Sequence, residues 1–404
     1  MMSIIKRLSA REGYHPILTY PLFVLRVMIC RRRYAKILAR LRGAKRIKVV
    51  FLSAGPSKWK YQTVYDEMKA AGKFELCVLC EEGEKAYYQG LGDECSTVAL
   101  ETLKPDIVFY QDPWSELAGR YPVWQVSMAS LCCYVPYSIE SIAQGGRSER
   151  FDYHHLANFH SLMYACYQWS EDYARHYARQ QCPWEWAGKV YGFGHPTLDP
   201  YYGKSTKGGE YVIYAPHFGF EYNGIMPISS IGTFPWSGKA LLKYAEAHPE
   251  VKWLFKPHPK LKARLLEIGM MTKDEVEAYY QAWERIGAAC YDGNYQKWFL
   301  DSRVMITDSN SFLLEYMAVG KPLIHLVPER TNMVSSKQAE EVFKTFYVAK
   351  NEAEMLSALK LVVEERSDPK HDERVAAAEC ACVLGNHAGK RIVESLLRTI
   401  GGEA

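Results

Sequence analysis

Short apolar runs alternate along the chain with longer segments in which apolar residues recur every three or four positions. In the first half, strands are predicted at 47–52, 74–79, 106–110, within 124–134 and at 189–196. Helical spacing separates them, for example at 61–71 and at 159–177. An alternation of strand and helix predicts a parallel sheet with helices on both faces.

The same alternation begins again after a polar, glycine-rich segment at 204–209. Strands are predicted at 211–215, 251–255, 304–306 and 322–327, and helices at 239–247, 276–285, 354–364, 374–384 and 389–398. The simplest interpretation of this pattern is two successive doubly wound α/β domains that face a central cleft. We place them at 46–203 and 204–404, with the last helix able to cross back onto the first domain.

Residues 1–45 form a basic amphipathic arm ahead of the first strand. Between Gly13 and Tyr65 there is no acidic residue, and the triple Arg31-Arg32-Arg33 follows a short apolar run. One interpretation is a helix that lies on an anionic membrane surface, which would place the protein on the inner face of the cell membrane. The alternative is a helix packed on the protein's own core with a solvated basic side. The apolar run is too short to span a bilayer.

Composition narrows the function classes. The 404 residues are 48% hydrophobic and 24% charged, as in ordinary globular proteins. The 11 cysteines do not have the spacing of a disulfide framework, so we expect reduced thiols in a cytoplasmic protein. Cys77 and Cys80 lack the second cysteine pair that a zinc site would need, so we expect no metal site, and we also expect no cofactor. The basic arm lacks base-stacking aromatics arranged on a sheet, which argues against nucleic-acid binding.

Polar residues follow the predicted strands of the second domain. His217 comes after the strand at 211–215, and Lys256 and His258 follow the strand at 251–255. The strand at 304–306 leads into a polar helix start that contains Asp308, Ser309, Asn310 and Ser311. Ligands of open α/β sheets bind beyond the carboxyl ends of the strands, and a helix start offers unpaired N–H groups to an anion. These clusters predict a site for a nucleotide diphosphate.

Each cluster also has a purely structural interpretation. His258 precedes a proline and can cap a turn, and Asp308 or Ser309 followed by Glu315 is a common helix start. The co-occurrence of a cation, imidazoles and hydroxyls in one half of the chain favours the anion site. His217 is then a candidate general base.

Several motifs resemble, in family order, those of the CDP-glycerol glycerophosphotransferases, which make teichoic acid and capsule polymers. They are Tyr214-Ala215-Pro216-His217, Gly232-Thr233-Phe234, Phe255-Lys256-Pro257-His258-Pro259, and Thr307-Asp308-Ser309-Asn310-Ser311 with Glu315-Tyr316 and Lys321-Pro322. The turn Gly194-His195-Pro196-x-x-Asp199 and the segment at 385–392, with Arg391, extend the resemblance over about residues 190–395. The family's N-terminal W-H-G-T motif has no counterpart here.

The resemblance implies a GT-B architecture, a peripheral membrane location, and transfer of a glycerol-phosphate unit from CDP-glycerol to a lipid-linked or polymer acceptor. It also implies little or no dependence on metal. His217 would be the base or would orient the acceptor, while Lys256 and His258 would neutralise the diphosphate. Asp308 would orient His258 or a serine. The donor ligands would be Ser309, Asn310, Ser311, Glu315, Thr233 and Arg391. Two alternatives stay open: a GT-B glycosyltransferase with a nucleotide-sugar donor, and a non-catalytic scaffold.

Overall fold

The computed structural model describes residues 16–139, 142–144, 157–171, 174–175, 189–204, 208–225, 227, 230–291, 295–331, 333–335, 337–382 and 387–402. The beginning of the predicted arm at 1–15 lies outside the described residues. The same holds for His154 and His155 and for 385–386 of the motif at 385–392. Among the described residues, every helix is too short or too polar to cross a membrane.

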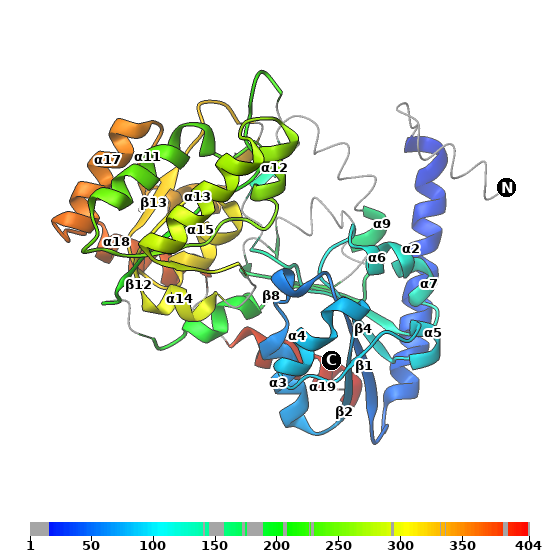
Figure 1. The fold of residues 1–404 in the computed structure, drawn as a ribbon. Helices are drawn as coiled ribbons and strands as arrows, with labels where there is room; N and C mark the ends of the chain where they lie inside the picture. The colour runs from blue at the N-terminus through cyan, green and yellow to red at the C-terminus, as the bar shows by residue number, and fades with distance from the viewer. Residues whose placement is uncertain are drawn as a thin grey trace.

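The first domain is built on a seven-stranded parallel sheet with the order β3-β2-β1-β4-β5-β7-β8 (Figure 1). The strands are β1 (Ile47–Leu52), β2 (Phe74–Leu79), β3 (Cys95–Ser96), β4 (Ile107–Tyr110), β5 (Leu131–Tyr134), β7 (Ala165–Gln168) and β8 (Lys189–Gly192). Between them lie η1 (Pro56–Lys58), α3 (Gln62–Ala71), η2 (Glu82–Glu84), α4 (Lys85–Gly90), α5 (Leu100–Leu103), α6 (Glu116–Arg120), α7 (Val123–Val126) and α9 (Ala157–His160). The short η3 (Pro196–Tyr201) leads out of the domain.

The second domain repeats this design with a six-stranded parallel sheet of order β11-β10-β9-β12-β13-β15. Its strands are β9 (Tyr211–Ala215), β10 (Lys252–Phe255), β11 (Ala288–Ala289), β12 (Ser302–Thr307), β13 (Leu323–Leu326) and β15 (Tyr347–Ala349). Its helices are α11 (Phe234–Ala247), α12 (Leu261–Glu267), α13 (Lys273–Ile286), α14 (Gln296–Asp301), α15 (Asn310–Met317), α16 (Lys337–Phe343), α17 (Glu352–Leu359), the π-helical η4 (Lys360–Glu364) and α18 (His371–Cys382).

Each sheet therefore has one topological switch point. The chain enters a sheet in the middle, adds two strands to one side, and then returns to add the next strand on the other side of the first. The loops after β1 and β4 diverge at this point in the first sheet, and the loops after β9 and β12 do so in the second. Crevices at such positions are where open α/β sheets bind ligands. The prediction of two doubly wound α/β domains is confirmed.

Most residues of the central strands are apolar and buried because helices cover both faces of each sheet. Phe51 stacks on Phe109 of the neighbouring strand with ring centroids 4.8 Å apart, and both side chains are fully buried. In the second domain the rings of Phe255 and Trp283 stack at 5.0 Å between β10 and α13. Burial of each such side chain contributes about 1.5–3 kcal/mol to folding.

The described part of the arm is the long helix α2 (Pro16–Leu41), which packs along the first domain (Figure 1). Its buried residues recur at helical spacing within the core of that domain: Val27, Cys30, Tyr34, Ile37 and Leu41. The Tyr34 hydroxyl donates to the Leu162 carbonyl at 2.6 Å. Arg32 and Lys36 face outward and are exposed. The helix thus covers the protein's own core, and contact of its basic face with a membrane stays a prediction.

The last helix, α19 (Ala388–Gly401), lies with the first domain although it follows the second in sequence (Figure 1). Its buried apolar residues belong to the core of the first domain: Ile392, Val393, Leu396 and Ile400. The N–H groups of Ala388 and Gly389 donate to the Asp199 carboxylate at 2.8 and 2.9 Å. A Cβ atom at Gly389 would come within 2.7 Å of the Thr63 backbone, so this close approach requires glycine. An antiparallel ribbon of β6 (Ile142–Gln144) and β14 (Met333–Ser335) also joins the domains.

One predicted element is wrong. The segment 159–177 was expected to be one helix, but α9 ends at His160 and β7 follows at Ala165–Gln168. All four residues of β7 are buried, and a short apolar run without alternation fits a core strand as well as a buried helix. The strand predicted within 124–134 is present as Leu131–Tyr134, which follows α7. The short strands β3, β11 and β15 were not predicted.

Candidate functional site

The carboxyl ends of β9 and β12 form a rigid base at the switch point of the second sheet. The Thr307 hydroxyl, at the end of β12, donates to the Ala215 carbonyl at the end of β9 at 2.7 Å. The Ser309 N–H in turn donates to the Thr307 hydroxyl at 2.9 Å. These two bonds fix the direction in which the chain leaves β12 and place Asp308 and Ser309 beside the loop that carries His217.

Asp308 joins three loops at this point. Its Oδ1 accepts the His217 N–H at 2.6 Å, and its Oδ2 accepts the Thr233 N–H at 2.6 Å and the Thr233 hydroxyl at 2.8 Å. The side chain is buried, and this burial raises the pKa of the carboxyl to about 6 although the hydrogen bonds oppose the shift. From the resemblance, Asp308 was expected to orient His258 or a serine. The structure shows its carboxylate engaged with the backbone of His217 and with Thr233.

The side chains of His217 and His258 lie against each other, with ring centroids 4.9 Å apart. Burial lowers the pKa of His217 to about 3, with a smaller contribution from His258. Burial also lowers the pKa of His258 to about 4, and the charges of Lys260, Lys256 and Lys58 add to the shift. Both rings are therefore neutral at pH 7.

The hydrogen bonds of the two rings also define their tautomers. Nδ1 of His217 accepts the Gly219 N–H at 3.0 Å, and Nδ1 of His258 accepts the Lys260 N–H at 3.1 Å. The one proton of each neutral ring is then on Nε2. In this state both imidazoles offer an N–H donor to a ligand. An Nε2 that carries its proton does not act as a base, so this tautomer argues against the general-base role predicted for His217.

Lys256 directly follows β10 and is buried, and its ammonium group lies close to the first turn of α15. Its Nζ is 4.9 Å from the ring centroid of Tyr295 and 5.6 Å from that of Phe312. Phe312 belongs to the first turn of α15, whose N-cap residue Ser309 makes no side-chain capping bond. Asn310 is half-buried and Ser311 is exposed at this helix start. An ammonium group beside a helix N-terminus without a side-chain cap is a favourable place for an anion.

Glu315 lies one turn further along α15 and is buried in a network between the domains. Its Oε1 accepts the Thr197 hydroxyl at 3.1 Å and the Tyr201 hydroxyl at 2.8 Å, both from η3. Its Oε2 accepts the Tyr295 hydroxyl at 2.7 Å, and Lys60 of the first domain donates to that same hydroxyl. The predicted contact of Glu315 with a ribose stays a prediction. In this structure its carboxylate connects α15 with the segment that leads out of the first domain.

Two other predicted positions lie on the side of the first domain. Arg391 of α19 stacks over the ring of Phe193, just after β8, at 4.9 Å. The structure thus brings His217, His258, Lys256, Asp308, Ser309 and Thr233 together, whereas the contacts of Arg391 are with the first domain. The His195 ring is buried and its Nε2 lies 2.8 Å from the Pro136 carbonyl, which fits the turn role expected for it.

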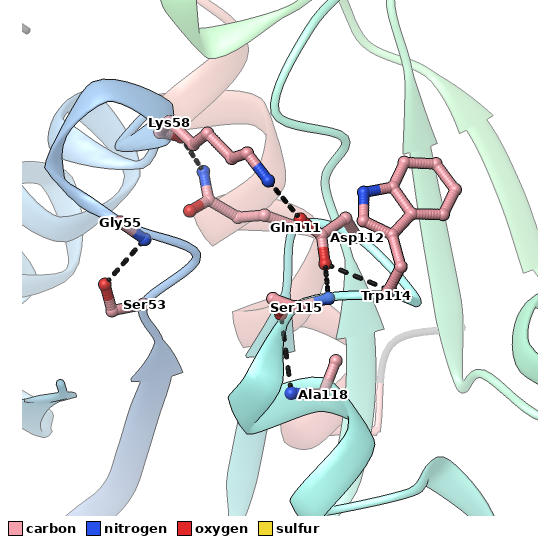
Figure 2. A network of polar contacts seen from close by, with 8 residues as sticks. All are labelled: Ser53, Gly55, Lys58, Gln111, Asp112, Trp114, Ser115 and Ala118. Atoms are coloured by element: carbon pink, nitrogen blue, oxygen red, sulfur yellow. Dashed lines mark hydrogen bonds and ion pairs between the residues drawn. The ribbon is translucent and has the colours of Figure 1, made fainter. Parts of the chain in front are cut away.

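A second polar group, which the sequence analysis missed, occupies the switch point of the first sheet (Figure 2). Lys58 in the loop after β1 pairs with Asp112 in the loop after β4, with Nζ and Oδ2 3.1 Å apart. The other oxygen of Asp112 accepts the N–H groups of Trp114 at 3.2 Å and Ser115 at 2.6 Å. The rule that polar residues after a strand mark a site, when applied to Asp112 after 106–110, would have found this group.

The site offers cations and N–H donors rather than a metal-binding cluster. Among the residues that the structure describes, no three His, Cys, Asp or Glu side chains are arranged to hold a metal ion. The donor set of imidazole Nε2–H groups, the Lys256 ammonium and the N-terminus of α15 is suited to a phosphate or diphosphate.

A scan against family models gave no match, and a search of curated proteins gave none either.

Solved structures do resemble the fold. The wall teichoic acid polymerase TagF, in a crystal soaked with CDPG, matches 97% of this chain and 99% of its own with a TM-score of 0.56 at 11% identity. The S. aureus protein MnaA with UDP matches 89% of this chain and 98% of its own, with a TM-score of 0.56 at 12% identity. UDP-GlcNAc 2-epimerase from Neisseria meningitidis, bound to UDP-GlcNAc, matches 87% of this chain and 100% of its own, with a TM-score of 0.51 at 14% identity.

These similarities extend over nearly the whole chain, including both sheets. At 11–14% identity they establish the architecture and no more. Together with the two parallel sheets of seven and six strands, they confirm the GT-B-like fold that the sequence predicts.

Proposed function

We propose that this protein transfers a glycerol-phosphate or related polyol-phosphate unit from CDP-glycerol to a hydroxyl acceptor and releases CMP. The acceptor would be a lipid-linked or polymer end in teichoic acid or capsule synthesis. The observation that carries the proposal is the convergence of His217, His258, Lys256 and the start of α15 at the switch point of the second sheet. That arrangement supports binding of a nucleotide diphosphate. It also gives a common role to the motifs that resemble those of the glycerophosphotransferases.

The geometry supports a reaction driven by charge stabilisation. The acceptor oxygen attacks the β-phosphorus of the donor in line, an O–P bond forms, the bond from that phosphorus to the CMP oxygen breaks, and the hydroxyl proton leaves to solvent. Negative charge grows on the oxygen that departs with CMP. The Nε2–H groups of His217 and His258 and the Lys256 ammonium stabilise this charge without moving a proton of their own.

Asp308 acts through the loops that it joins. Its hydrogen bonds to the His217 N–H and to Thr233 hold the imidazole in position, and they bring the start of α11 next to the start of α15. A preorganised donor set of this kind does not have to reorganise as the charge develops. Asp308 is thus a positioning residue, and the imidazoles and Lys256 are the groups that contact the donor.

A nucleotide-sugar donor is the second candidate function. One of the similar structures reported above is a UDP-GlcNAc 2-epimerase, and two of those three structures contain UDP or UDP-GlcNAc. A diphosphate would bind the same donor set in either case. The two functions differ in the atom attacked, which is phosphorus in one and a sugar carbon in the other.

Nucleotide release distinguishes the candidates. The purified protein is incubated with CDP-glycerol, UDP-GlcNAc and other nucleotide sugars in the presence of glycerol 3-phosphate as the acceptor probe, and CMP and UDP are quantified by chromatography. We expect CMP from CDP-glycerol alone. UDP release from a nucleotide sugar would replace the first candidate with the second. A protein that neither releases a nucleotide nor binds CDP or CMP in calorimetry would be a scaffold.

The basic outer face of α2 supports a location at an anionic membrane surface. Arg32 and Lys36 are exposed on the side of the helix opposite to its buried residues. A membrane location would bring the enzyme to a lipid-linked acceptor. Each exposed basic residue close to an anionic bilayer contributes about 1 kcal/mol to binding.

A further inference from the structure

Lysines from both domains approach the junction where the proposed donor site lies. Lys256 belongs to the donor site itself, and Lys60 donates to the Tyr295 hydroxyl within the network around Glu315. The charge of Lys58, which comes from the first domain, adds to the lowering of the His258 pKa, as do the charges of Lys256 and Lys260. Lys60 lies two residues after Lys58, and the Tyr295 ring that it contacts is 4.9 Å from the Lys256 Nζ, so the loop after β1 reaches the donor site.

Lys58 is held in place and is still accessible. Its side chain is 33% exposed, whereas that of its partner Asp112 is 1% exposed. Asp112 is fixed by the Trp114 and Ser115 N–H groups on its other oxygen, so the carboxylate is a rigid anchor for the lysine (Figure 2). The Lys58 Nζ also lies 5.1 Å from the ring centroid of Tyr137, which limits where it can move.

The surrounding loops have the features of a ligand site. They leave the carboxyl ends of β1 and β4, the switch point of the first sheet, where ligands of open sheets bind. Gln111 donates through Nε2 to the Lys58 carbonyl at 2.7 Å, and its buried Oε1 has no hydrogen-bond partner among the described residues. A buried acceptor without a partner is rare in folded proteins, and a ligand hydroxyl would satisfy it.

We propose that the loops after β1 and β4 form a second anion-binding subsite, in which Lys58 contacts a phosphate of the acceptor and Asp112 positions Lys58. The inference rests on the proposed function and adds a substrate class to it. The acceptor carries a phosphate close to its reacting hydroxyl, as the terminal unit of a glycerol-phosphate chain does. In this arrangement the second domain neutralises the donor diphosphate, and the first domain recognises the acceptor by its charge.

The test separates acceptor binding from donor binding. Glycerol 3-phosphate is titrated by calorimetry into protein saturated with CDP, and initial rates are measured with glycerol 3-phosphate and CDP-glycerol each varied in turn. Lys58→Met should weaken glycerol 3-phosphate binding and raise its KM at least tenfold, with the KM for CDP-glycerol within twofold of the wild type. Lys58→Arg, which keeps the charge, should recover most of the affinity. The matched control is Lys48→Met, on exposed β1 surface beside Glu75, which should change nothing.

Asp112→Asn tests the positioning role. The asparagine oxygen can still accept the Trp114 and Ser115 N–H groups, but the ion pair with Lys58 is lost, so the KM for glycerol 3-phosphate should rise while the thermal melting temperature stays within about 2 °C. An unchanged acceptor KM in both Lys58→Met and Asp112→Asn overturns the inference and leaves the proposed function intact. Absence of CDP binding in the wild type overturns the proposed function. In that case Lys58-dependent binding of glycerol 3-phosphate alone still supports the subsite, and Lys58-independent binding overturns it.

Discussion

The loops after β9 and β12 and the loops after β1 and β4 occupy equivalent positions in two sheets of the same strand order, but they carry different chemistry. In the second domain, two imidazoles with lowered pKa values and a helix start surround one lysine. In the first domain, Lys58 is paired with a buried carboxylate. The first set offers several N–H donors and an ammonium group to an incoming dianion, whereas the second offers a single cation paired with a carboxylate.

Under the proposed function, this contrast would allow one topology to bind two ligands. A diphosphate that gains charge during reaction needs donors that do not lose protons, which neutral imidazoles held at Nδ1 by backbone N–H groups provide. The proposed acceptor must bind and leave, so it needs weaker attraction, which a lysine paired with Asp112 would provide. Four experiments test this difference between the two regions.

The largest effect is expected at His258. Replacement by alanine removes one Nε2–H donor from the developing charge and should lower kcat for CMP release by about 10²–10³, the usual loss for one such donor. CDP affinity should fall much less. His371→Ala, a histidine on α18 in the second domain, is the matched control. Turnover within threefold of the wild type for His258→Ala would remove this residue from the mechanism.

Asp308 is expected to combine a stability effect with an activity effect. Asp308→Ala leaves the His217 and Thr233 N–H groups without their acceptor in a buried place, which should lower the free energy of unfolding by about 1–3 kcal/mol. Urea denaturation measures this loss. Asp308→Asn keeps one acceptor oxygen and should lose less. If the alanine variant were as stable as the wild type, Asp308 would not be the connection between the loops that the structure indicates.

The outer face of the first domain should respond to charge reversal. Arg32→Glu and Lys36→Glu should each weaken sedimentation with phosphatidylglycerol vesicles roughly fivefold, about 1 kcal/mol per position, because both residues are exposed on α2. High salt should have the same effect. Lys273→Glu and Lys344→Glu on the second domain serve as controls. These point variants are preferable to deletion of residues 1–43, since Val27, Tyr34 and Leu41 complete the core. Vesicle binding that is unchanged by the two α2 variants and by high salt would leave α2 with a packing role only.

The smallest effect is a change in protonation. Burial and nearby lysines lower the pKa of His258 to about 4, and a bound diphosphate would offset the lysine charges and raise this pKa. CDP binding should therefore take up a fraction of a proton, and the uptake should grow as the pH falls from 7.5 to 6. Calorimetry in buffers of different ionisation enthalpy measures it. His258→Ala should abolish most of the uptake, and an unchanged value in that variant would assign it to another group.

The parts of this molecule that the sequence predicts are those that depend on local pattern. Strands β1, β2 and β9 follow from runs of apolar residues bounded by turn residues, and Asp308 and His258 follow from their places after such strands. The Lys60–Tyr295–Glu315 network could not be predicted, because its members are up to 235 positions apart and meet only once both domains are folded. The strand β7 was missed because a buried apolar run has no period that tells a strand from a helix.

The return of α19 to the first domain has a consequence for synthesis. The sheet of that domain leaves the ribosome early, but part of its core is Ile392, Leu396 and Ile400, which are translated about 200 residues after its last strand, β8. At usual translation rates of about 5–20 residues per second, the nascent first domain waits on the order of ten seconds or more with an uncovered apolar surface. Its maturation is thus tied to completion of the polypeptide, and a chaperone that shields this surface would be most needed in that interval.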